Sequence, residues 1–113
     1  MVVELGYFTI GVPDVKRAAK FYGELFGWAF DQPVEDVYAH VNNTGLPFGL
    51  NKAAPADLSS FYFRVDGIEA VAAKVNALGG VAGAITKSPS GLGSLCSDDQ
   101  GVKFSLWQAA EGY

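Results

Sequence analysis

The sequence predicts an α+β fold made of two copies of one module, in which a strand is followed by a helix and then by three more strands. The segment FTIGVPDVKRAAKFYGELFGW, which starts at Phe8, is matched without a gap by FYFRVDGIEAVAAKVNALGGV, which starts at Phe61, an offset of 61 − 8 = 53. Each copy opens with apolar residues at every second position and then changes to a spacing of three to four. That change is typical of a strand followed by an amphipathic helix.

A second internal match closes the module. LPFGLNKAA, which starts at Leu46, resembles VKFSLWQAA, which starts at Val102, an offset of 102 − 46 = 56. Only two copies are present, which favours a duplication over a repeat array. We therefore expect one domain, residues 1–113, made of two modules at about 1–54 and 58–113, with a linker at 53–57 between them.

The first helix is expected at residues 14–26. Asp14 is suited to be its N-cap, and Gly27 is suited to end it in the left-handed conformation. Phe21 lies off the apolar stripe of this helix, and we expect it to cover the helix flank or to contact another chain.

The second helix is expected at residues 67–78, where Asp66 and Glu69 have the spacing of a capping box. Glycines follow both helices. The strands of the two modules are expected at residues 3–12, 28–30, 37–41, 46–52, 60–65, 81–87, 93–97 and 102–108.

Composition excludes several classes of protein. Hydrophobic residues make up 50% of the chain and charged residues 18%, which argues against disorder. The net charge is −4 and there is no basic run, so we expect no nucleic-acid partner. No apolar run is long enough to cross a bilayer and no secretory pattern precedes the first strand, so we expect a cytoplasmic protein without a membrane partner. Cys96 is the only cysteine, which excludes an intramolecular disulfide.

Alternation along the strands separates two faces. One face is apolar and is expected to form the core under the helices: Phe8, Ile10, Phe48, Leu50, Phe61, Phe63, Phe104 and Leu106. The other face is polar and aromatic: Tyr7, Thr9, Gly49, Asn51, Ser60, Tyr62, Arg64, Lys103, Ser105 and Trp107. Exposed Trp and Tyr side chains are unusual on a plain solvent face, so this second face is expected to line a ligand cavity.

A set of short motifs follows the two modules in order. They are V-x-D-V before a helix carrying A-x-x-F-Y and L-x-G, and then V-D-G-I, L-G-G and the closing D-x-x-G-x-K-F-S-L-W-Q. With these motifs the chain resembles, over essentially its whole length, the vicinal oxygen chelate superfamily, which includes glyoxalases, bleomycin-resistance proteins and extradiol dioxygenases. The resemblance implies two βαβββ modules that form a curved mixed sheet around a cavity with the helices outside, often in a homodimer.

Metal enzymes of that superfamily carry a ligand near the start of the first strand and on the last strand of each module. The resemblance places these positions at Tyr7, Gly49, Ser60 and Ser105. The usual ligands are His and Glu, whereas neutral Ser and Tyr are poor ligands and Gly offers no side chain. We therefore expect neither a metal nor another cofactor.

The remaining chemistry leaves alternatives open. His40 is either a general base in the cavity or a surface histidine. Arg64 and Lys103 share the expected cavity face, where they either clamp an anion or extend into water. Cys96 is interpreted as an inert thiol, and residues 98–99 as turn-forming aspartates. The glycine-rich SPSGLGS segment precedes no helix, so it is a hairpin or a flap over the cavity and not a phosphate loop.

Three functions are compatible with these observations. The first is a metal-free protein that binds a small organic molecule for sequestration, resistance or sensing, with binding residues Tyr7, Asn51, Ser60, Tyr62, Ser105 and Trp107. The second is a metal-independent, glyoxalase-type lyase or isomerase, for which His40 and Tyr7 are the candidate catalytic residues. The third is a structural subunit without a ligand. A homodimer is expected in each case, because short modules leave open sheet edges and apolar surface such as Trp28.

Overall fold

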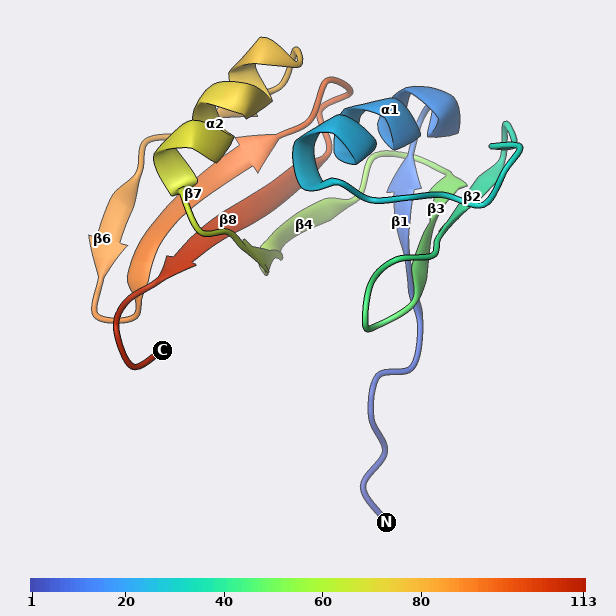
Figure 1. Ribbon diagram of the computed structural model, residues 1–113. Coiled ribbons are helices and arrows are strands. Elements are labelled where there is room, and N and C mark those ends of the chain that lie inside the picture. The colour runs from blue at the N-terminus through green and yellow to red at the C-terminus, as the bar shows by residue number, and fades with distance from the viewer. The chain divides into compact units, whose positions relative to one another are not determined.

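The computed structural model describes all residues of the chain, 1–113 (Figure 1). The chain forms two compact units, Met1–Ala56 and Asp57–Tyr113, and each is described by itself. Both units combine one helix with one sheet, as the α+β prediction requires. No helix is both long enough and apolar enough to cross a membrane.

The first unit has a three-stranded sheet in the order β1-β3-β2. Its elements are β1 (Phe8–Val12), α1 (Val15–Phe26), β2 (Tyr38–Val41) and β3 (Phe48–Lys52). Strand β1 runs parallel to β3, and β2 runs antiparallel to β3. The strand expected at residues 28–30 is reduced to a single bridge between Phe30 and Val41, and the first strand begins at Phe8 instead of residue 3.

The second unit has a five-stranded sheet in the order β4-β8-β7-β5, with β6 also paired to β7. Its elements are β4 (Asp57–Arg64), α2 (Ile68–Ala77), β5 (Val81–Ala82), β6 (Thr86–Ser88), β7 (Gly91–Ser97) and β8 (Lys103–Ala109). The strand expected at residues 81–87 is therefore divided into β5 and β6. In both units the first strand lies parallel to the last, and the last lies antiparallel to the one before it.

Strand register shows that the two units use their repeated residues alike. Thr9 is the partner of Gly49 in the first unit, and Tyr62 is the partner of Ser105 in the second. The sequence offsets relate these pairs, since 9 + 53 = 62 and 49 + 56 = 105. The same offsets carry the pair Ile10 and Leu50 onto Phe63 and Leu106. The repeat seen in the sequence therefore corresponds to a repeated strand pairing.

The repeat fails at one position of the core, because β4 is interrupted by a bulge. Leu58 pairs with Phe104 and the next pair is Tyr62 with Ser105, so three residues of β4 have no partner on β8. The prediction that Phe61 lies in the core is wrong: its side chain is 42% exposed, and Leu58, at 7%, fills the place. The Ser59 N–H donates to the Asp57 carboxylate at 2.9 Å at the start of the bulge, which lowers the pKa of Asp57.

Helix α1 begins and ends as its sequence indicates. The Arg17 N–H donates to the Asp14 carboxylate at 3.1 Å, and Gly27 ends the helix with φ of 71°. Phe21, which we expected to cover the helix flank or to contact another chain, is buried at 3% exposure and packs edge-to-face against Tyr22. The helix therefore buries a wider face than its apolar stripe indicated.

Helix α2 begins differently from the prediction. Gly67 is its N-cap and no side chain of the helix start caps it, so the capping box of Asp66 and Glu69 is not formed. The Ile68 N–H donates instead to the Gln108 side chain on β8, at 2.9 Å. This contact satisfies one of the free amides of the first turn from the neighbouring sheet and fixes the helix start to the end of β8.

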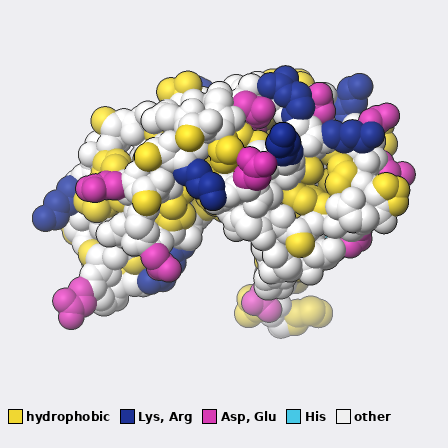
Figure 2. All heavy atoms as spheres, turned by 45° about the horizontal axis from the view of Figure 1, so that its top comes forward, with side chains coloured by type: hydrophobic (Ala, Val, Ile, Leu, Met, Phe, Trp, Pro, Cys, Tyr) yellow, Lys and Arg dark blue, Asp and Glu magenta, His cyan; other side chains and the backbone are white.

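Each helix covers the apolar face of its own sheet: α1 contacts β2 and β3, and α2 contacts β5, β7 and β8 (Figure 1). The fully buried side chains on these faces include Ile10 and Leu50 in the first unit and Phe104 and Leu106 in the second. Figure 2 shows Lys and Arg side chains interspersed with Asp and Glu on the face in view, so neither sign of charge forms a patch there. Because each helix covers one face of its sheet, the opposite face is the one left open for a site.

Candidate functional site

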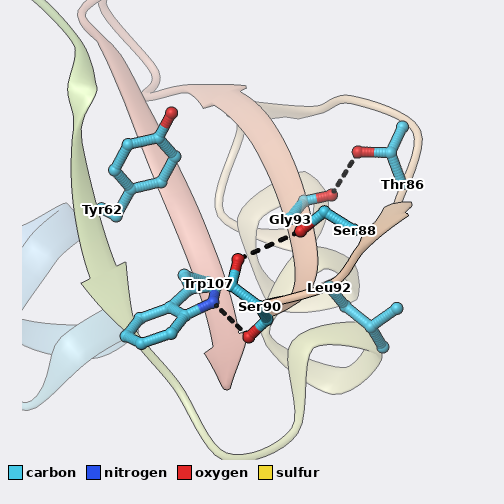
Figure 3. A pocket seen from close by; sticks show the side chains of 7 residues that line it. All are labelled: Tyr62, Thr86, Ser88, Ser90, Leu92, Gly93 and Trp107. Carbon is cyan, nitrogen blue, oxygen red and sulfur yellow. Dashed lines mark hydrogen bonds between the residues drawn. The ribbon is translucent and has the colours of Figure 1, made fainter. Parts of the chain in front are cut away.

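A pocket of about 610 Å³ opens on the sheet of the second unit, on the face that α2 does not cover (Figure 3). Its residues come from four strands and a turn. They are Tyr62 on β4, Trp107 on β8, Leu92 and Gly93 on β7, Thr86 and Ser88 on β6, and Ser90 in the turn after β6. Two aromatic rings and three hydroxyl side chains make this a pocket with apolar walls and a few hydrogen-bonding groups.

Strand register explains why the pocket is open. Trp107 has Gly93 as its antiparallel partner on β7, and Gly93 has Thr86 as its partner on β6. A glycine beside the indole has no side chain to fill the space over the sheet. Next to Trp107 on the other side, β4 places Arg64 as its partner and Tyr62 two residues earlier on the same face. The side chain of Leu92 points away from both rings in Figure 3.

Hydrogen bonds hold the wall of the pocket. The Trp107 Nε1–H donates to the main-chain oxygen of Ser90 at 3.1 Å, which fixes the plane of the indole. The hydroxyls of Ser88 and Ser90 lie 3.1 Å apart. The hydroxyl of Tyr62 has no hydrogen-bond partner, and its side chain is 65% exposed. Trp107 is therefore a fixed surface of the pocket, whereas the Tyr62 hydroxyl remains available to a ligand.

The structure brings together two of the six predicted binding residues, Tyr62 and Trp107. Ser105 lies on the same strand face as Trp107 but is 5% exposed, and its hydroxyl donates to the Ser59 main-chain oxygen at 2.7 Å. Ser60 is an exposed residue of the β4 bulge. Neither serine lines the pocket.

The other two predicted binding residues, Tyr7 and Asn51, belong to the first unit. Asn51 is half-buried on β3 between Gly11 and Tyr38. The Tyr7 hydroxyl lies 3.1 Å from Nδ1 of His40, and the two rings are parallel within 7°. The structure thus joins the two candidate catalytic residues in one hydrogen-bonded pair on the surface of the first unit.

Thr86, Ser88 and Ser90 were missed as pocket residues by the sequence analysis. The alternation of Thr86 and Ser88 along a short strand was the available signal, but no repeated partner in the first module pointed to it. The SPSGLGS segment was interpreted as a hairpin or a flap, and in the structure it contains the turn between β6 and β7. It supplies Ser88 and Ser90 to the pocket and places the Ser90 main-chain oxygen against the Trp107 indole.

The remaining chemical candidates have structural roles. Cys96 is buried at 3% exposure and donates weakly to the Ser94 main-chain oxygen. Asp98 is a turn former, although a buried one: its carboxylate accepts from the Gln100 and Val102 N–H groups at 2.8 and 3.0 Å. No group of three or more His, Cys, Asp or Glu side chains that could hold a metal ion occurs in residues 1–113.

Comparison with known families decides the ancestry of this fold. Residues 4–106 match the family model described as the Glyoxalase/Bleomycin resistance protein/Dioxygenase superfamily. The chain belongs to this superfamily. A search of curated proteins found no match.

Solved structures of this superfamily share the fold at low sequence identity. An antibiotic binding protein, TnmS3, from Streptomyces sp. CB03234 is 23% identical, with a TM-score of 0.71 over 96% of this chain and 98% of that chain. A bleomycin-binding protein from Streptomyces verticillus, in complex with copper(II)-bleomycin, is 16% identical, with a TM-score of 0.67 over 97% and 100%. The fosfomycin resistance protein FosX from Listeria monocytogenes is 14% identical, with a TM-score of 0.78 over 98% and 97%.

The residues at the positions that the resemblance assigns to metal ligands are engaged in other contacts in both units. In the first unit the Tyr7 hydroxyl is bonded to His40, and the space where Gly49 would carry a side chain is filled by the ring of Tyr38. In the second unit the Ser105 hydroxyl already donates to a main-chain oxygen. Neutral hydroxyls and a glycine do not replace the His and Glu ligands of metal sites.

Proposed function

We propose that this chain binds a small organic molecule in the pocket of its second unit, without a metal, and acts by sequestration, resistance or sensing. The observation that carries the proposal is a pair of aromatic side chains, Tyr62 and Trp107. Together with hydroxyl side chains they line a pocket of about 610 Å³. That volume lies within the usual range of small-molecule sites, which combine apolar walls with a few polar groups. Trp and Tyr rings bind flat ligands by stacking.

Relatives with the same fold support this reading of the pocket. Two of the similar structures are described as an antibiotic binding protein and a bleomycin-binding protein, and a third as a fosfomycin resistance protein. The identities of 14–23% carry over no ligand and no residue role, so the proposal rests on the geometry of this chain.

Ligand binding is tested by thermal unfolding with copper(II)-bleomycin, fosfomycin and, as a neutral flat probe, naphthalene-2-carboxamide. At a concentration of about 100 Kd a ligand stabilises the native state by about 2.7 kcal/mol, which raises Tm by several degrees. We expect at least one of the three to raise Tm of the wild type and to have little effect on Trp107→Ala. The proposal fails if none of them raises Tm, or if the variant responds as the wild type does.

Metal addition is expected to leave the protein unchanged. Because the four metal positions carry Tyr7, Gly49, Ser60 and Ser105, Zn²⁺, Ni²⁺, Mn²⁺ or Fe²⁺ should not alter Tm and should not produce turnover of a glutathione hemithioacetal. Elemental analysis of the purified protein provides a second readout. A stoichiometric metal that stabilises the protein would contradict the expectation.

The second candidate function is a metal-independent lyase or isomerase of the glyoxalase type. The observation that favours it is the 3.1 Å contact between the Tyr7 hydroxyl and Nδ1 of His40, since such a pair can pass a proton to or from a substrate. Turnover of the hemithioacetal without added metal, lost in His40→Asn, would support this function over simple binding.

We also propose that the protein is a homodimer of about 24 kDa, twice the 11.9 kDa chain, as expected for short modules with open sheet edges.

A further inference from the structure

The guanidinium of Arg64 lies over the ring of Trp107, with its carbon 5.2 Å from the ring centroid. Arg64 is the strand partner of Trp107 and lies on the same face of β4 as Tyr62. Trp107 and Tyr62 both line the pocket. A positive charge is therefore held at the edge of the pocket, directly beside its aromatic wall.

No Asp or Glu side chain pairs with this charge. Lys16 forms an ion pair with Asp36, whereas Arg64 forms none with an acidic side chain. Its one hydrogen bond is long, 3.4 Å to the main-chain oxygen of Tyr113, the last residue of the sequence. A guanidinium has five N–H donors in a planar fork, so most of its donors remain available to a ligand.

The neighbouring charges single out Arg64. Lys103 lies on the same face of β8 as Trp107, but Asp57 is its partner across the strand pair. None of the residues that line the pocket is acidic or basic. A ligand on the Trp107 ring would thus lie next to the positive charge of Arg64, although the net charge of the chain is −4.

We propose that the pocket selects a flat aromatic molecule that carries an anionic group such as a carboxylate, a proposal that rests on the function proposed above. The ring system of the ligand stacks on the wall formed by Trp107 and Tyr62. The anionic group meets Arg64 in the two-pronged geometry that guanidinium groups form with carboxylates. The hydroxyls of Thr86, Ser88 and Ser90, which also line the pocket, form hydrogen bonds with its polar substituents.

Two probes of equal shape test the charge preference: naphthalene-2-carboxylate and its neutral analogue naphthalene-2-carboxamide. Isothermal titration calorimetry measures both Kd values for the wild type, Arg64→Gln, Arg64→Lys and Lys87→Gln. Lys87→Gln is the matched control, because Lys87 alternates with the pocket residues Thr86 and Ser88 along β6 and does not line the pocket. The two Gln variants remove the same unit of charge.

We expect the wild type to bind the carboxylate about tenfold more tightly than the amide, a difference of about 1.4 kcal/mol. Arg64→Gln should abolish this preference by weakening carboxylate binding alone, Arg64→Lys should keep part of it, and Lys87→Gln should keep all of it. Equal affinities in the wild type, or an unchanged preference in Arg64→Gln, would overturn the charge selectivity while leaving small-molecule binding intact. If neither probe binds at millimolar concentration, the selectivity fails, and the proposed binding function fails with it only if copper(II)-bleomycin and fosfomycin also leave Tm unchanged.

Discussion

Phe104→Ala is expected to lower the free energy of unfolding by about 3–5 kcal/mol, the usual cost of removing a buried phenylalanine. Phe104 is completely buried on the face of β8 that α2 covers, between its strand partners Leu58 and Cys96. Its ring also meets Phe63, with centroids 6.3 Å apart. Removal of the ring leaves a void that these neighbours close only in part, and urea denaturation measures the loss.

The matched comparison is Trp107→Ala on the same strand. Trp107 is half-buried and lines an open pocket, so its removal should cost less than Phe104→Ala even though its side chain is larger. The variant also loses the hydrogen bond to Ser90, which contributes about 1 kcal/mol. If both variants lose the same stability and Trp107→Ala leaves ligand binding intact, the aromatic face is ordinary packing and the binding site proposed here is wrong.

The contrast between Phe104 and Trp107 was predictable from the sequence, because strand alternation in a repeated module assigns each residue to one face. The internal repeat supplied the register as well. Gly49 and Ser105 occupy equivalent places in the two units, as the offset of 56 indicates. Alternation along each strand therefore predicted which face most residues lie on, and the internal repeat predicted which residues occupy equivalent places in the two sheets.

The bulge in β4 shows where that reasoning stops. Alternation placed Phe61 inside because Phe8, its counterpart, begins the equivalent strand. In the structure the Asp57 side chain bonds to the Ser59 N–H, and the following residues leave the ladder before Tyr62 resumes it. A three-residue irregularity shifts an apolar side chain from the core to the surface without changing the composition of the strand. Leu58 and the two serines after it were the local signal.

The pocket was only half predictable for a related reason. Tyr62 and Trp107 lie on strands that the repeat identifies, whereas β6 has no counterpart recognised in the first module. The pairing of β6 with β7 decides where the hydroxyls of Thr86 and Ser88 lie. Thr86 pairs with Gly93, Lys87 with Leu92, and Ser88 with Gly91. That pairing depends on backbone conformation at Gly91, which no periodicity in the sequence reveals.

Gly91→Ala is expected to destabilise the second unit by about 2–5 kcal/mol, through backbone strain and overpacking together. Gly91 begins β7 with φ of 139°, a conformation that residues with a side chain rarely adopt. A Cβ atom at this position would overlap the main-chain oxygen of Gln108 and lie 2.8 Å from the Ala110 nitrogen. Both obstacles are backbone atoms next to β7, so they cannot move aside as a flexible side chain would.

Gly93→Ala is the control for this change, since it adds the same methyl group two residues further along β7. Gly93 has a negative φ, and the nearest atom to its added Cβ is the Leu106 main-chain oxygen at 3.7 Å, an ordinary contact. We expect the free energy of unfolding of this variant to lie within about 1 kcal/mol of the wild-type value. Because Gly93 lines the pocket beside Trp107, the methyl group should change the affinity for naphthalene-2-carboxamide more than it changes stability.

Gly91→Ala should show the converse behaviour. Displacement of Gly91 moves Ser90, whose main-chain oxygen accepts from both the Ala110 N–H and the Trp107 indole. The variant should therefore lose stability and binding together, by urea denaturation and by calorimetry. Equal stabilities of the two alanine variants would mean that the β6–β7 turn relaxes around the extra methyl group. The turn would then be too pliable to hold the indole in place, and the pocket could not be the preformed site that stacking on Trp107 requires.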